Sequence, residues 1–221
     1  LLVVMATLTL LHLRIKPIEH KPIEHHVWDD LKEGLNTVFG YFPFAMIILL
    51  AGFSGFCAWP YIFQLPIVNA YDLHGTPMTL GLLLAVGGLG GTIGAFLLSF
   101  RKKVLYLSRY MLSSIIIMSI SLIGLSFCRH VITAGFAIFF LDLGMSCLFV
   151  TTSVFFQQIV AEEQRGRAMS ILVLSVFGLV PFGSLIFFGG LGQWLGAMAM
   201  FRIAGFIGFI VFIIFLINLK R

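Results

Sequence analysis

The sequence predicts an all-α polytopic membrane protein with six transmembrane helices. Its 221 residues are 60% hydrophobic and 10% charged, whereas a soluble domain has about 25% charged residues. Six apolar runs are long enough to cross a bilayer, which takes about 20 residues. These runs are rich in Leu, Ile, Phe, Gly and Ala and lack the alternation of a membrane β-barrel, so helices are expected.

The six runs follow a short apolar run and a polar segment. Residues 1–13 are too short to span and begin in mid-run, which predicts the tail of a truncated preceding transmembrane helix. Residues 14–42 predict a cytoplasmic linker that ends in an amphipathic helix, and residues 43–221 a six-helix transmembrane bundle. The expected spans are 43–66, 77–100, 104–127, 131–156, 169–192 and 197–219. Prolines expected to kink or break spans one and five are Pro60, Pro66 and Pro181.

The basic residues orient the bundle. Of the 14 Lys and Arg residues, four precede span one, four lie at the connection from span two to span three, two lie between spans four and five, and two end the chain. Arg129 and Arg202 alone fall on the opposite side. Because positive residues stay cytoplasmic, both ends of the six-span unit are expected in the cytoplasm, with the protein in the inner (plasma) membrane. Basic residues confined to connectors also argue against a nucleic-acid partner.

The sequence contains no motif that predicts a metal site, a bound cofactor or an enzyme active site. The pentapeptide "KPIEH" occurs at 16–20 and again at 21–25, followed by His26. Its prolines keep the segment extended and its spacing matches no ligand motif, so a linker is predicted and no metal site. No His lies at the middle of a span, which argues against haem ligation, a Ser-His protease and a membrane enzyme of lipid metabolism. No ATP-binding motif is present, and no cofactor is expected.

The second span contains the glycine-rich stretch "GGLGGTIG". Ile93 stands where the third glycine of a nucleotide-binding loop would be, so that interpretation fails. Gly87 with Gly91, and Gly90 with Gly94, instead form small-xxx-small pairs that let neighbouring helices approach closely.

Asp142 is the only acidic residue inside the six predicted spans. It lies about 16 Å from the outer end of span four, where a carboxylate is costly unless it is hydrated, paired or protonated. Ser146, Ser153 and Gln157 share its helix face. Two interpretations stay open: a protonatable or substrate-contacting group in a cavity, or a carboxyl hydrogen-bonded across a helix interface.

Other polar and aromatic residues lie near the predicted outer ends of spans one and six. Trp59 and Tyr61 are expected in an aromatic belt, while Gln64 and Asn69 are candidates for a substrate path. Arg202 is expected either to reach the headgroups or to face the cavity and attract an anionic substrate.

The stretch "VAEEQRGRAMS" concentrates charge at the turn between spans four and five. Arg165 and Arg167 suit positive-inside anchors. With Glu162 and Glu163 they are also candidates for ion pairs that latch the cytoplasmic face, each worth about 0–1 kcal/mol.

Three stretches resemble the C-terminal half of a major facilitator superfamily transporter, in the drug and siderophore exporter branch that includes the enterobactin exporter. They are "DLKEGLNTVFGYFP", "LPIVNAYDLHGTPMTLGLLLAVGGLGGTIGAFLLS" and "FFQQIVAEEQRGRAMSILVLSVFGLVPFGSLIFFGG". The resemblance implies two three-helix inverted repeats, alternating access around a midplane site, and spans one and four lining the cavity. Ala161 departs from the branch, which usually has Pro there.

The function expected from these observations is secondary active transport. The resemblance implies efflux of a small molecule, coupled to proton entry, with the lipid bilayer, the substrate and a missing N-terminal half as partners. A non-transporting remnant or an accessory membrane subunit is the competing hypothesis.

Overall fold

A computed structural model describes residues 42–99 and 107–219, and it confirms the six predicted membrane-spanning helices. The tail at 1–13, the linker up to residue 41, and the bases at 101–103 and 220–221 lie outside the described residues. No strand occurs in the described ranges. The spans are Phe44–Asp72, Pro77–Leu98, Leu107–Leu125, Val131–Ile159, Arg165–Leu195 and Ala197–Ile217.

Span one is longer than predicted and consists of four helical pieces. Helix α3 (Phe42–Phe53) continues into the π-helix η1 (Ser54–Ala58), and α4 (Tyr61–Ile67) into the π-helix η2 (Val68–Asp72). The α-helix is interrupted beside Pro60, as predicted. The end predicted at Pro66 is wrong: Pro66 lies inside α4, and π-helical turns carry the span on to Asp72.

Spans two to four are single α-helices: α5 (Pro77–Ser99), α6 (Leu107–Leu125) and α7 (Val131–Ile159). The connector between spans one and two is held by Asn69, which is 4% exposed. Its Nδ2 donates to the Thr76 carbonyl oxygen at 3.0 Å, and its Oδ1 accepts from the Thr79 hydroxyl at 2.8 Å. Asn69 therefore closes a turn, and its place on a substrate path stays a prediction.

Span five is broken into pieces like span one. After the 3₁₀ turn η4 (Glu162–Gln164) it runs through α8 (Arg165–Val173), the π-helix η5 (Leu174–Gly178), α9 (Val180–Phe182), the π-helix η6 (Gly183–Leu191) and α10 (Gly192–Leu195). The predicted irregularity at Pro181 is present, with π-helical turns on both sides of it. Gly196, with φ of 82°, turns the chain into α11 (Ala197–Leu219), which is span six.

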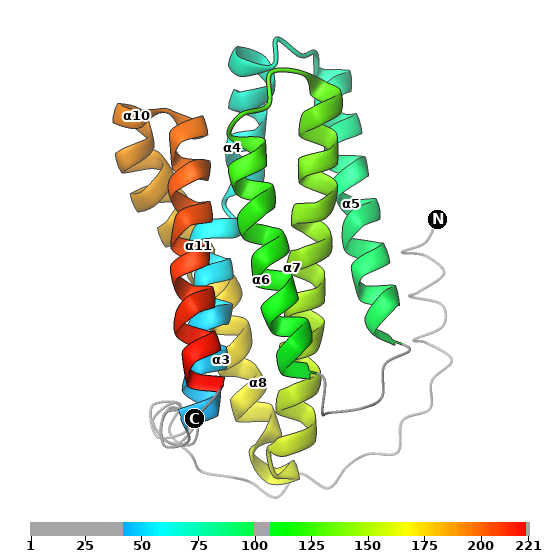
Figure 1. Ribbon diagram of the computed structural model, residues 1–221, viewed down its shortest axis with the longest axis vertical. Helices are drawn as coiled ribbons and strands as arrows, with labels where there is room; N and C mark the ends of the chain where they lie inside the picture. The colour runs from blue at the N-terminus through cyan, green and yellow to red at the C-terminus, as the bar shows by residue number, and fades with distance from the viewer. Residues whose placement is uncertain (1–41, 100–106, 220–221) are drawn as a thin grey trace, which may run out of the picture.

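The spans pack as an antiparallel bundle (Figure 1). Helix α5 packs along α7, α7 along α6, and α6 along α11, while span five packs against span one. The connectors at 73–76 and 126–130 lie at one end, and the start of α3, the 160–164 turn and the end of α11 at the other (Figure 1). Side chains with no exposed surface fill the centre, among them Leu50, Leu65, Ile115, Leu122, Ile138 and Phe201.

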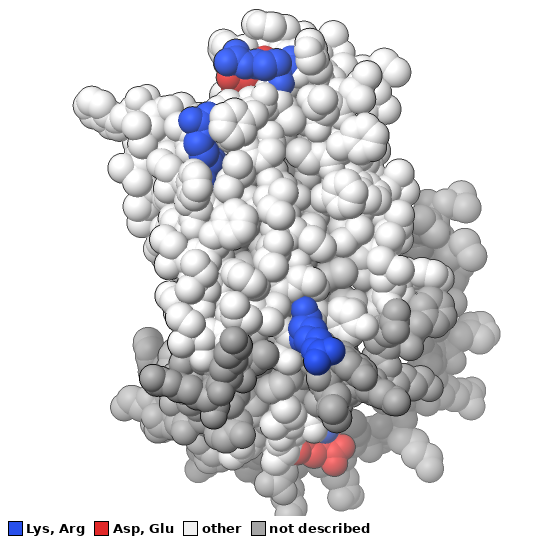
Figure 2. Space-filling model, viewed as in Figure 1, with Lys and Arg blue, Asp and Glu red and all other residues white. Residues whose placement is uncertain are grey.

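The surface of the bundle is largely apolar. Figure 2 shows charged side chains toward the two ends of the molecule and a band between them that carries none. Large hydrophobic side chains on this surface, such as Phe63, Phe96 and Ile213, are half exposed or more. Such a surface is stable in lipid, so the chain is a multi-pass membrane protein.

Candidate functional site

Asp142 lies near the middle of span four, where it meets span one. Met145 is the central residue of the 29-residue span Val131–Ile159, so Asp142 is three residues, or about 4.5 Å, from the centre. The Tyr61 hydroxyl lies 2.8 Å from one carboxylate oxygen and 2.9 Å from the other. One donor is thus shared by both oxygens, which ties span one to span four at mid-membrane depth.

Tyr61 is a buried partner of Asp142, and its predicted place in an aromatic belt is wrong. Its side chain is 2% exposed. It lies three residues beyond Ala58, the middle of the span Phe44–Asp72. The belt prediction placed Tyr61 near the end of a span that closed at Pro66; because the span continues to Asp72, Tyr61 is central instead. Trp59 is half-buried and packs on Phe177, with ring centroids 5.2 Å apart.

Glycines of α5 bring span two against this pair. A Cβ at Gly87 would overlap a carboxylate oxygen of Asp142, and one at Gly90 would overlap the Phe139 carbonyl oxygen. A Cβ at Gly94 would lie 2.6 Å from the Leu143 carbonyl oxygen, whereas at Gly91 the nearest atoms, in Asp142 and Ser146, are 3.9 and 4.0 Å away. Three of the four predicted packing glycines are therefore in close contact with α7, and Gly91 lies beside that contact.

The other polar residues of the Asp142 face continue along α7. Ser146 and Ser153 are half-buried and Gln157 is exposed. The Ser153 Oγ is buried and has no hydrogen-bond partner among the described residues. A buried hydroxyl without a partner is uncommon in folded proteins, where such groups usually bind another polar group or an ordered water. Gln64, on span one, is half-buried, and its side chain forms no hydrogen bond within the described part of the chain.

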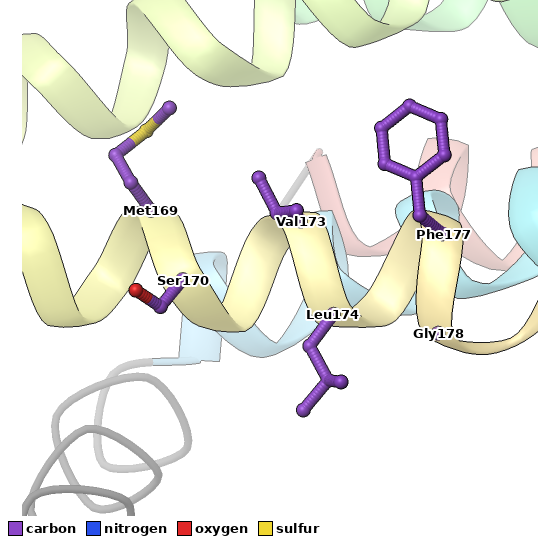
Figure 3. A pocket seen from close by; sticks show the side chains of 6 residues that line it. All are labelled: Met169, Ser170, Val173, Leu174, Phe177 and Gly178. Atoms are coloured by element: carbon purple, nitrogen blue, oxygen red, sulfur yellow. The ribbon is translucent and has the colours of Figure 1, made fainter.

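A hollow of about 610 Å³ lies along the first half of span five. It is lined by Met169, Ser170, Val173, Leu174, Phe177 and Gly178. In Figure 3, Met169, Val173 and Phe177 point to one side of the helix, while Ser170 and Leu174 point to the other. Phe177 lies 5.8 Å from the ring of Phe149 on α7, one helical turn beyond Ser146. One residue of the lining, Phe177, therefore packs against α7, while all six lining residues belong to span five.

The charged cluster at the turn between spans four and five begins α8. Glu162 is exposed and forms no ion pair with the residues that the structure describes. Arg165 is half-buried, and its Nε has no hydrogen-bond partner within those same ranges. Arg167 is half-buried and takes part in an interaction, and the Glu163 side chain lies outside the described set. The ion-pair latch stays a prediction.

Among residues 42–99 and 107–219, no group of three or more His, Cys, Asp and Glu side chains is placed to hold a metal ion. The His-rich pentapeptide repeat lies outside these residues. The polar groups that the structure places where spans one, two and four meet are the Asp142 carboxyl group and the Tyr61 hydroxyl, with Ser146 beside Gly91.

A family profile described as transmembrane secretion effector, within the major facilitator superfamily, matches residues 2–220. The chain belongs to this family. The Staphyloferrin A transporter of Staphylococcus aureus is 27% identical over 143 residues, which are 64% of this chain and 34% of that protein. The chain thus spans about a third of the length of this relative. No solved structure is significantly similar to it.

Membership of the secretion effector family confirms the resemblance to major facilitator exporters. Sequence reasoning identified Asp142 from its charge inside an apolar run, but it missed Tyr61. The signal for Tyr61 lay in its position: a phenol directly after Pro60, at mid-span once the helix is extended past Pro66. The hollow beside span five had no sequence signal, because four of its six lining residues are ordinary apolar side chains and Ser170 and Gly178 form no motif.

Proposed function

We propose that the chain is the C-terminal half of a secondary active exporter that couples efflux of a small molecule, such as a drug or siderophore, to proton entry by alternating access. The family description supports transport in the secretory direction, and the relative's name supports a siderophore-type substrate. The observation that carries the proposal is the Tyr61–Asp142 hydrogen bond near the middle of two spans.

The geometry suits a carboxyl group that exchanges partners. An ionised carboxylate accepts at both oxygens, as Asp142 does from Tyr61; once protonated, one oxygen becomes a donor. Because Tyr61 belongs to span one and Asp142 to span four, a proton on Asp142 changes the attachment between the two spans. Substrate would reach the same depth along the hollow and past Ser146 and Ser153. The proton site and the substrate path would then share one helix face.

The proposal includes an orientation and a partner. Arg165 and Arg167 lie at one end of the bundle and Arg129 at the other, in keeping with a cytoplasmic 160–164 turn. Both ends of the six-span unit would then face the cytoplasm of a cell with the protein in its inner membrane. An N-terminal half would complete the substrate cavity, and the limited coverage of the relative fits this division.

Proteoliposomes test the coupling. We would reconstitute the protein that carries this chain and measure efflux of ethidium, erythromycin and staphyloferrin A, with and without an imposed proton gradient. Efflux of at least one probe should rise with the gradient in the unchanged protein. Asp142→Asn should abolish that response, while Asp72→Asn, a carboxylate at the end of span one, should retain it. Gradient-driven efflux at full rate in Asp142→Asn would refute the role of Asp142.

The competing proposal is a non-transporting remnant or accessory subunit, which the short match to the relative also favours. The same vesicles decide between the two. If none of the three probes moves in either condition, whereas the protein binds at least one of them, the remnant hypothesis is the better one.

A further inference from the structure

Arg202 lies within span six with no acidic partner among the described residues. It is five residues beyond Ala197, the start of the span, and therefore about 7.5 Å below that end. It is exposed and makes no ion pair with any residue in the described ranges. A guanidinium at this depth is costly unless it reaches an anion or the headgroup layer.

The end of span three holds this guanidinium in one place. Its Cζ lies 4.5 Å from the centroid of the Phe127 ring, and its Nε lies 3.5 Å from the Ser126 Oγ. Stacking occupies one face of the guanidinium and leaves its in-plane donors available. Arg202 is thus positioned away from Asp142, which contacts Tyr61 and Gly87 on spans one and two.

A continuous apolar stripe runs down span six from Arg202. Its members are Phe206, Ile210, Ile213 and Ile217, which are 57%, 57%, 51% and 57% exposed. Their spacing of three or four residues keeps them on one face of the helix. On span three, Ile120 is 57% exposed as well. A cationic head above a long apolar strip matches the shape and polarity of one phospholipid molecule.

The two helices beneath the stripe are packed backbone to backbone. A Cβ at Gly205 would lie 2.8 Å from the Ser119 carbonyl oxygen, and one at Gly208 would overlap the Ser119 Oγ. Substitution-intolerant contacts of this kind fix the distance between spans three and six. Arg202 and Phe127 are therefore presented by a rigid pair of helices, one turn above Gly205.

We propose that Arg202, Phe127 and Ser126 form a binding site for the phosphate of an anionic phospholipid, whose acyl chain lies along the Phe206–Ile217 stripe. The guanidinium donates to the phosphate oxygens, and Phe127 holds it at the height of the headgroup. The site is separate from the proposed transport path, and it stands or fails independently of that function.

Native mass spectrometry of the 221-residue chain in detergent tests the site, with phosphatidylglycerol as the titrated ligand. Arg202→Gln should weaken binding of the first lipid about fivefold, as expected for loss of one basic contact with an anionic lipid. Arg202→Lys keeps the charge but loses the planar stacking on Phe127, so its affinity for the first lipid should lie between those of the unchanged protein and Arg202→Gln. Arg129→Gln is the matched control, because Arg129 is exposed at the same end but has no aromatic ring or hydroxyl among the described residues to hold its guanidinium in place, as Arg202 has; it should change binding by less than about twofold.

Several outcomes would overturn the proposal. Equal losses in Arg202→Gln and Arg129→Gln would show attraction by diffuse charge. Binding of phosphatidylcholine as tight as that of phosphatidylglycerol would exclude a site for an anionic lipid. Displacement of the lipid by millimolar inorganic phosphate would exclude it as well. A dimer mass that disappears in Phe206→Ser would show that a second copy of the chain covers the stripe.

Discussion

Replacing Gly90 with alanine tests the backbone contact between spans two and four. The new Cβ would overlap the Phe139 carbonyl oxygen, which belongs to the backbone and cannot rotate away. Overpacking of this kind costs about 1–3 kcal/mol. Gly91→Ala is the matched control, because its Cβ would meet only ordinary contacts at 3.9 and 4.0 Å. Both substitutions gain the same helix propensity, about 1 kcal/mol, so it cancels in the comparison.

The free energy of unfolding should therefore differ by about 1–3 kcal/mol between the two variants. At about 2–4 °C per kcal/mol, the apparent Tm of Gly90→Ala should lie roughly 2–12 °C below that of Gly91→Ala. Heating in detergent with a thiol-reactive fluorophore reports unfolding, because Cys57 is a free thiol that is 3% exposed. Equal Tm values would refute the contact with Phe139. A lower Tm for Gly91→Ala would mean that α5 is rotated by one residue.

Three further substitutions probe single contacts. Tyr61→Phe removes the hydroxyl that donates to the mid-span carboxylate and should destabilise the protein by about 1–3 kcal/mol, whereas Tyr71→Phe, at a side chain 77% exposed, should leave the apparent Tm unchanged. Asn69→Ala deletes two hydrogen bonds of the first connector, so limited proteolysis should cut residues 73–76 faster, and an unchanged cleavage rate would contradict that role. Gly196→Ala places a side chain at φ of 82° and ψ of 154°, a region nearly confined to glycine, and should cost about 1–3 kcal/mol in thermal unfolding, while Gly124→Ala, in a helix with open space around it, should not destabilise.

The number of spans was predictable because composition alone separates apolar runs from their connectors. Their ends were less predictable, as Pro66 shows: its missing donor predicts a break, but wide turns after it keep the span helical to Asp72. The position of that boundary determines the predicted depth of Tyr61. A span that ends at Pro66 places Tyr61 near a membrane surface, whereas the longer span places it at the centre. Asp142 was identifiable because a lone carboxyl group inside an apolar run is costly in lipid and is rarely found without a partner or a role in a pathway.

The partner of Asp142 was beyond the sequence for a different reason. A hydrogen bond between residues 81 positions apart depends on how two helices cross, and no local pattern records that crossing. The glycines of span two predicted part of the packing around Asp142. Their spacing predicted a close approach of span two, but the identity of the facing helix came only from the structure.

The π-helical turns of spans one and five have a consequence for any scan of side-chain accessibility. Each such turn takes up one residue more than an α-helical turn, so the faces before and after it are out of phase by about 100°. The π-helical turns at η1, η5 and η6 lie against one another: Gly55, inside η1, packs on the Val176 carbonyl inside η5, and Gly183, at the start of η6, packs on the Phe56 carbonyl inside η1. A helical wheel that assumes 3.6 residues per turn throughout either span therefore places residues on one face that in fact point in different directions before and after a π-helical turn. Cysteine labelling along span one should therefore show a change of phase at residues 54–58 and a second one at residues 68–72.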